Sequence, residues 1–173
     1  MFAYIKDSTF QYFIPQSTAF EIDGISYPSN WLNLSTPEEK AAVGIVDVVY
    51  GTQPDDRYYW VSQDAPVYAD GVVTVNYTAT PKDLTSLKVM ATNQVNQTAG
   101  SILAPSDYMV IKAFETSTPI DATWNTWRNG IRSQAVAQKT AIAACTTVEQ
   151  LIALTPIVWA NDPNYVAPAE VTP

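Results

Sequence analysis

The spacing of apolar residues changes at Thr80-Pro81, and this change restricts the chain to two parts with different secondary structure. Before this point, short runs of aromatic and β-branched residues alternate with turn sequences, as is typical of strands. After it, Leu84 and Leu87 begin a series of apolar residues spaced three and four apart, which predicts helices. We therefore expect an α+β chain, with a small antiparallel β-sandwich or sheet domain over residues 1–79 and an α-helical domain over residues 80–155.

Two hairpins and one short helix are predicted in the first part. Asp23-Gly24 and Asp70-Gly71 each separate two short apolar runs, and Asp-Gly is a preferred sequence for tight hairpin turns. Thr36-Pro37-Glu38-Glu39 combines an N-cap, a proline at the first helical position and a reciprocal glutamate. This pattern predicts a helix that ends near Gly44.

The second part is expected to contain several helices and then a tail. Thr80-Pro81 predicts the start of the first helix, of roughly five turns. The second helix, residues 107–115, is apolar on most sides and is expected at the centre of the domain. The third runs over about residues 120–139, and a short one follows Thr146-Thr-Val-Glu149. Residues 156–173 contain four prolines and should form an extended tail.

The residues needed for most catalytic chemistry are missing from the sequence. There is no histidine, which removes the usual general base and the usual metal ligand. The six glycines are isolated, so no phosphate-binding loop is predicted. Carboxylate catalysis would have to use the acids beside the aromatic residues, which are Asp55, Asp56, Asp64 and Asp70. Asp55-Asp56 is instead predicted in a solvated turn after Pro54, and Asp70 in a hairpin turn. We therefore expect no enzyme activity, no catalytic residue, no cofactor and no metal.

Charge and hydropathy exclude two further classes of partner. The net charge is −8 and the nine Lys and Arg residues are scattered, which is unsuited to nucleic acid. No apolar stretch is long enough to span a bilayer, and the N-terminus does not resemble a signal peptide. The single cysteine, Cys145, is expected to be a small buried residue. Another protein is the class of partner that these properties favour.

Acids and aromatic residues are concentrated in the first part. Residues 1–80 hold ten acids against three bases, and fourteen of the twenty aromatic residues. Aromatic side chains beside acids are typical of sugar-binding sites, but a small sheet also needs aromatic residues for its core. Both readings of these aromatic residues stay open at this point.

The second part resembles the C-terminal region of phage tail fibre assembly proteins, the tail fibre chaperones. The resemblance covers mainly residues 80–160 and lies in three segments: 106–115, 124–132 and 146–151. The pattern of this family is a Trp, an aromatic-Arg pair three residues later, and a second Arg four residues beyond the first. Here the aromatic-Arg pair is Trp127-Arg128, with Trp127 where the family usually has Tyr.

The resemblance implies a chaperone that binds the distal part of a trimeric tail fibre and assists its folding and trimerisation. Such a protein would itself be a homotrimer, at least in complex with the fibre, would act in the host cytoplasm and would be absent from the mature virion. Fibre tips expose strand edges and apolar faces while they assemble, so a protein that covers them is useful. The alternatives are a virion structural protein, such as a fibre-to-baseplate adaptor, and a carbohydrate-binding receptor-recognition module.

With this family in mind, two sets of residues are candidates for binding other chains. The expected client contacts are Tyr58, Tyr59, Trp60, Tyr68 and Tyr77. The expected self-association residues are Leu84, Leu87, Trp124, Trp127, Arg128, Ile131 and Arg132. Trp124, Trp127 and Ile131 either fill the core of the helical domain or face another subunit. Arg128 and Arg132 either pair with acids or with the last carbonyls of a helix, or form a solvated stripe.

Overall fold

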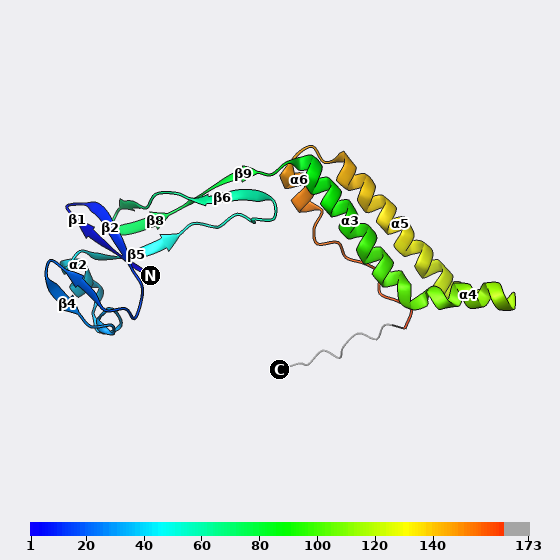
Figure 1. Cartoon of the computed structure of the whole chain (residues 1–173), viewed down its shortest axis with the longest axis horizontal. Coiled ribbons are helices and arrows are strands. Elements are labelled where there is room, and N and C mark those ends of the chain that lie inside the picture. Colours follow the sequence, from blue (N-terminus) through cyan, green and yellow to red (C-terminus); the bar gives the residue numbers. More distant parts are fainter. Residues whose placement is uncertain (165–173) are drawn as a thin grey trace. The chain divides into compact units, whose positions relative to one another are not determined.

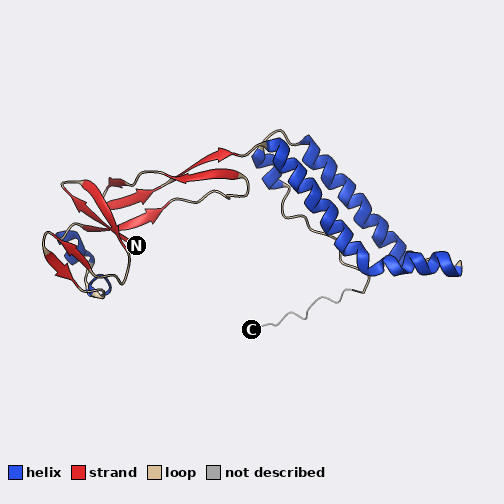
Figure 2. Ribbon diagram, viewed as in Figure 1, coloured by secondary structure: helices blue, strands red, loops and turns tan. Residues whose placement is uncertain are grey.

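The computed structural model describes residues 1–164 and has mixed α+β architecture, with a curled sheet region followed by helices (Figures 1 and 2). The chain divides into two compact units, Met1–Thr80 and the residues from Pro81 onward. The strands are β1 (Phe2–Lys6), β2 (Thr9–Ile14), β3 (Phe20–Ile22), β4 (Ile25–Tyr27), β5 (Ile45–Tyr50), β6 (Tyr59–Gln63), β7 (Val67–Ala69), β8 (Val72–Val75) and β9 (Tyr77–Pro81). Two short helices interrupt them, α1 (Trp31–Leu34) and α2 (Pro37–Ala42).

The largest sheet of the first unit has the strand order β2-β1-β5-β8-β7. Its neighbours pair antiparallel except β5 and β8, which run parallel with Val49 opposite Thr74. The sequence predicted antiparallel pairing throughout. The difference arises because the residues between Tyr50 and Val72 form a long excursion, and a long connection is what parallel neighbours require.

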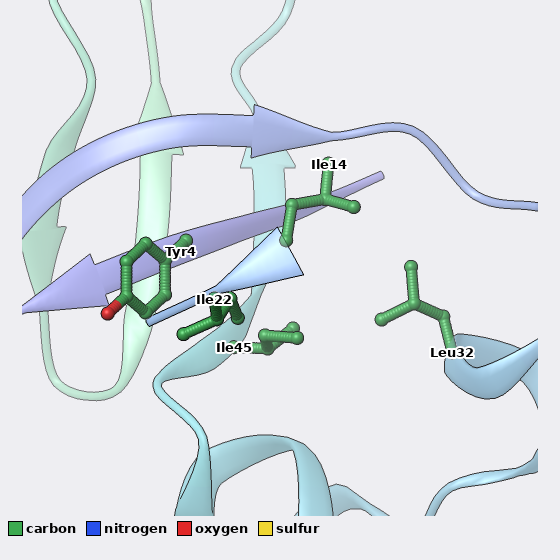
Figure 3. Close-up of a cluster of buried hydrophobic side chains, with 5 residues drawn as sticks. All are labelled: Tyr4, Ile14, Ile22, Leu32 and Ile45. Carbon is green, nitrogen blue, oxygen red and sulfur yellow. The ribbon is translucent and has the colours of Figure 1, made fainter. Parts of the chain in front are cut away.

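Strand β1 lies at the centre of this unit because both of its faces are buried. Tyr4 packs on one face with Ile14, Ile22, Leu32 and Ile45, whose side chains converge in Figure 3. On the other face, a second cluster is formed by Ala3, Ile5, Val73 and Val75. Alternate residues of one strand thus enter two cores, as the period of two in a strand requires.

The short-range predictions for this unit are confirmed. Asp23 and Gly24 have φ values of 49° and 80°, and Asp70 and Gly71 have 52° and 79°, so both Asp-Gly pairs form tight hairpin turns. Thr36 and Glu39 form the reciprocal capping box at the start of α2. Helix α1 was not predicted. It is four residues long and has no side-chain cap, so its stability comes from packing that local sequence does not reveal.

Gly44 is required where the chain passes from α2 into β5. Its φ is +75°, in the left-handed region. Its N–H donates to the Ala41 carbonyl at 3.0 Å, and its own carbonyl accepts the N–H of Ile5 at 2.7 Å. A Cβ at this position would lie 2.4 Å from the carbonyl oxygen of Ile5. The close approach of β1 therefore excludes any side chain here.

The second unit is built on two long antiparallel helices. Its elements are α3 (Leu84–Leu103), the 3-10 turn η1 (Ala104–Ser106), α4 (Asp107–Thr116), α5 (Ala122–Ala144) and α6 (Val148–Ala153). Figure 1 shows α3 and α5 side by side, and the Lys88 ammonium donates to the Ala143 carbonyl at 2.8 Å. The interior of the unit is formed by Leu87, Val95, Ala99, Ile131, Ala135, Ile142, Cys145, Val148 and Leu151.

The start of α3 differs from the prediction. Thr80 and Pro81 end strand β9, and the N-cap is Asp83, whose carboxylate accepts the N–H of Ser86 at 2.7 Å. An Asp is as good an N-cap as a Thr, so sequence preference alone did not separate the two positions. The burial of Cys145 is confirmed, and its Sγ donates to the Ala141 carbonyl at 3.4 Å.

Residues 156–164, the described part of the predicted tail, form no helix or strand. They are attached to α5 through their backbone: the Trp127 indole N–H donates to the Ala160 carbonyl at 3.1 Å, and the Gln134 amide to the Val158 carbonyl at 2.5 Å. Residues 165–173 of the predicted tail lie outside the described residues. Within residues 1–164, none of the helices combines the length and hydropathy needed to cross a bilayer.

Candidate functional site

Helix α4 exposes most of its apolar side chains, which corrects the prediction that it lies at the centre of its domain. The exposed fractions are 60% for Tyr108, 42% for Val110, 59% for Ile111 and 89% for Phe114, and none of its residues is buried. We call these four residues the α4 surface. Figure 2 shows α4 continuing beyond the end of the α3–α5 pair, so those helices leave it uncovered.

The α4 surface occupies one side of the helix, and the two acids at the ends of α4, Asp107 and Glu115, lie on the same side. At about 100° per residue, its four side chains fall within an arc of about 160°. Met109 and Ala113 lie on the remaining side and line a groove against the start of α5. An apolar stripe of this width normally faces a protein core. In α4 it faces solvent.

Arg128 fixes the direction in which α4 leaves α3. Its guanidinium is buried, with a side chain only 3% exposed, and it donates to the Leu103 carbonyl at 3.1 Å and to the Asp107 carboxylate at 2.6 Å. It also donates to the hydroxyl of Ser106, a residue only 2% exposed. One side chain of α5 therefore joins the last carbonyl of α3 to the first residue of α4.

Arg128 and Arg132 have different roles in the structure, and each corresponds to one of the two predicted alternatives. Arg128 pairs with both an acid and a terminal helix carbonyl, as one alternative predicted. Arg132 is exposed, and its guanidinium contacts the Asn129 amide oxygen at 3.4 Å. Arg132 therefore fits the solvated alternative, although the two residues lie one turn apart on α5.

Of the other predicted self-association residues, Trp124 alone lies beside α4. The groove between α4 and α5 has a volume of about 250 Å³, and its lining includes Tyr108, Lys112, Ile120 and Trp124. Trp124 meets Trp127 edge to face, with ring centroids 5.5 Å apart. The groove has a mixed lining, in which the polar residues are Lys112, Thr116, Thr118 and Asp121.

Leu84, Leu87 and Ile131 are placed differently. Leu87 and Ile131 lie in the interior of the unit, so their side chains pack against their own chain. Leu84 is half-buried in the first turn of α3. That turn is separated from α4 by the 20 residues of α3, about 30 Å of helix.

The predicted client contacts gather mainly on the ribbon formed by β6 and β9. Tyr59 and Trp60 lie on β6 and Tyr77 lies on β9, and the two strands form a separate two-stranded sheet. Trp60 is 68% exposed. Tyr58 precedes β6 and lies under the Arg57 guanidinium, 5.5 Å from its ring centroid, whereas Tyr68 packs against the second core cluster.

Three of the four acids weighed for carboxylate catalysis have structural roles. Asp55 receives the guanidinium of Arg57 at 2.5 Å, and this hydrogen bond raises the pKa of Arg57 above its ordinary value. Asp64 accepts the Thr78 hydroxyl at 2.7 Å, and Asp70 forms a hairpin turn. In the part of the chain that the structure describes, no three acids or cysteines come together as a candidate metal site.

The α4 surface was not predicted from the sequence, because the prediction rested on the apolar residues of the segment and not on the residues at the two ends of the helix. Pro105 and the η1 turn precede α4, and Ser117 follows it with a left-handed φ of 52°. Lys112 and Glu115 add charge to a helix of ten residues. Helix-breaking residues at both ends, together with two charged residues in so short a helix, are the sequence features that indicate an exposed position for α4.

Comparison of the chain with protein-family models, with curated proteins and with solved structures finds no match. The surfaces described above are therefore the structural basis for a functional proposal.

Proposed function

We propose that this chain is a tail fibre assembly chaperone, which binds the distal part of a trimeric phage tail fibre and assists its folding and trimerisation. The observation that carries the proposal is the exposed Trp60 on the β6–β9 ribbon. A Trp fixed on a strand but 68% exposed is the type of residue that contributes most to protein binding. The sequence resemblance supplies the identity of the client.

The ribbon suits a client made of strands. Because β6 and β9 form a two-stranded sheet, each has an edge that faces away from the other strand. Such an edge can pair temporarily with a strand of an unfinished fibre, and the exposed ring of Trp60 adds apolar contact. Temporary strand pairing would keep fibre chains from pairing with the wrong partner.

The acidity of the first unit supports the same role. Residues 1–80 carry ten acids and three bases, a net charge of −7. Mutual repulsion at this charge opposes aggregation of a unit that displays aromatic rings. The unit can therefore present an apolar binding surface and remain dispersed.

The proposed mode of action is surface contact, without catalysis, cofactor or metal. Three copies, one for each fibre chain, would match the threefold symmetry of the client. The protein would act in the host cytoplasm and leave before the virion is complete. Quantitative mass spectrometry of purified virions tests this last point, because an adaptor would be present at the stoichiometry of the fibre.

Co-expression with a tail fibre gene of the same phage tests the proposal directly. We expect the chain to raise the yield of soluble trimeric fibre, and Trp60→Ser to weaken fibre binding at least about 10-fold. Leu34→Ser is the matched control, since Leu34 is an apolar residue of the same unit that is 77% exposed but lies on α1. A fibre that is equally soluble and trimeric without this chain would contradict the proposal.

A further inference from the structure

The stretch of chain that follows α6 lies along α5 in an extended form. Ile157 and Trp159 are half-buried, and the residues that alternate with them, Val158 and Ala160, are exposed. A period of two is that of an extended backbone, whose successive side chains point to opposite sides. We call residues 156–161 the strap.

Two side chains on one side of α5 hold the strap by its backbone. Trp127 and Gln134 are seven residues apart, which is two turns of helix, so both project from the same side. They donate to the carbonyls of Ala160 at 3.1 Å and Val158 at 2.5 Å. In an extended chain, carbonyls two residues apart point the same way. The donors are about 10 Å apart along the helix and the carbonyls about 7 Å along the strap, a difference that the long side chains span.

The features of the strap that α5 binds are those of an extended apolar segment in general. The two hydrogen bonds use main-chain oxygen atoms. The half-buried side chains, Ile157 and Trp159, occupy alternate positions. Apolar residues at alternate positions are the pattern of a strand that has one apolar face. A strand of another protein that has lost or not yet found its neighbours presents the same features.

The strap is held weakly enough to exchange with such a segment. None of the described residues 156–164 is buried, and both hydrogen bonds to α5 are exposed. Segments with few buried contacts open at low cost. The Trp127 ring keeps its contact with Trp124 when the strap leaves, because the two rings meet edge to face with centroids 5.5 Å apart. The donor is therefore already oriented for a replacement.

We infer that α5 carries a binding site for extended polypeptide segments with apolar side chains at alternate positions, and that the strap occupies this site as an internal competitor. A segment of another protein binds by displacing the strap. The inference goes beyond the proposed function, because the site lies on α5 and not on the β6–β9 ribbon. An unpaired strand of a fibre chain is one ligand of this class.

Fluorescence anisotropy of a labelled peptide tests the site on the full chain. The probe is a synthetic peptide with the sequence of residues 155–164, which contains the strap. In the parent chain the tethered strap competes at a high effective concentration, so the probe should bind weakly. Trp159→Ser in the chain removes an anchor of the competitor, and the probe should then bind at least about 10-fold more tightly. Ile157→Ser is a second variant of the same design.

The donor on α5 is tested in the Trp159→Ser chain, which we call the opened chain. Adding Trp127→Phe keeps an aromatic ring but removes the indole N–H, and should weaken probe binding about 5-fold. Val136→Ser in the same background is the matched control, because Val136 is 60% exposed on α5 and lies about 200° around the helix from Gln134. Circular dichroism confirms that each variant is folded.

Three outcomes of these measurements overturn the inference. The first is an opened chain that does not bind the probe, and the second is equal binding by the parent and opened chains. The third is binding to the opened chain that Trp127→Phe leaves unchanged or that Val136→Ser weakens equally.

Two altered peptides test the class of ligand. A peptide with Ile157→Leu and Trp159→Phe keeps the alternate apolar positions, and should bind the opened chain within about 10-fold of the probe. A peptide that exchanges Trp159 with Ala160 has the composition of the probe but breaks the alternation, and should bind at least about 10-fold more weakly. Loss of the first peptide would show a site specific to the strap. Equal binding of the second would show that alternation is not recognised.

These outcomes are separate from those that test the proposed function. The peptide measurements use the chain without a fibre, and fibre solubility is measured in co-expression. A chain that binds no peptide but still yields soluble trimeric fibre overturns the α5 site and leaves the chaperone proposal in place. An opened chain that binds the probe, combined with a fibre that needs no helper, has the opposite meaning.

Discussion

Arg128 concentrates three interactions of the helical unit on one buried side chain. Its planar guanidinium reaches the Leu103 carbonyl, the Ser106 hydroxyl and the Asp107 carboxylate, which belong to three consecutive elements. The carboxylate of Asp107 balances the charge of the Arg128 guanidinium. Asp107 lies at the margin of the unit, with its side chain 57% exposed. A buried ion pair is weak evidence for stability in general, but this one sets the geometry between α3 and α4.

Substitution of Arg128 by Lys tests this geometry. We expect a loss of about 2–3 kcal/mol in the free energy of unfolding, because one ammonium cannot satisfy all three acceptors. Arg132→Lys, one turn further along α5 and exposed, should change it by less than about 0.5 kcal/mol. Urea denaturation of the two variants measures the difference. Equal stability of the two would show that the guanidinium geometry is unimportant.

A second comparison of two single substitutions uses Gly44 and Gly24. Both have a positive φ, so alanine should cost each about 1–2 kcal/mol in backbone strain. A Cβ on Gly24 would have no neighbouring atom within 4 Å, whereas a Cβ on Gly44 would clash with the Ile5 carbonyl. Gly44→Ala should therefore destabilise the first unit at least about 2 kcal/mol more than Gly24→Ala does. Chemical denaturation followed by far-UV circular dichroism gives both values.

At the scale of elements, the N-cap of α3 makes the stability of the helical unit depend on pH. The Ser86 side chain and then the Ser86 N–H donate to Asp83 and lower the pKa of its carboxyl below the ordinary value of 3.8. Its contribution is therefore fully present above the pKa of the unfolded chain and is lost as pH falls through the lower pKa of the folded state.

Asp83→Asn separates this effect from the loss of an acceptor. The amide oxygen still accepts the Ser86 N–H but carries no charge. We expect the variant to be less stable than the parent chain at neutral pH, and the difference to shrink as the pH falls below about 4. Urea denaturation over this range measures it. A difference that stays constant with pH would exclude the carboxylate charge as its source.

Elements with local signals were predictable, and those set by distant packing were not. Asp23-Gly24 and the Thr36 capping box specify their structures within four residues, and both were predicted. The parallel pairing of β5 with β8 depends on where a long excursion returns, which no short segment encodes. The exposed position of α4 likewise depends on Arg128, a residue of another helix.

At the scale of the whole chain, acidity and apolar exposure are divided between the two units. The first carries a net charge of −7 and displays Trp60, and the second is nearly neutral and displays the α4 surface. The candidate client residues of the ribbon were identified from sequence because aromatic residues cluster there. The α4 surface was not, since hydropathy alone does not distinguish a core helix from an uncovered one.

The attachment of residues 158–160 to α5 does not depend on the side chains of Val158 and Ala160. Trp127 and Gln134 bind the carbonyl oxygens of Ala160 and Val158, and every residue type offers the same oxygen. The Val158 side chain is 82% exposed and contributes little to the attachment. Substitutions of the Val158 and Ala160 side chains should therefore leave the path of this segment over the helix unchanged, whereas loss of the Trp127 or Gln134 side chain should release it.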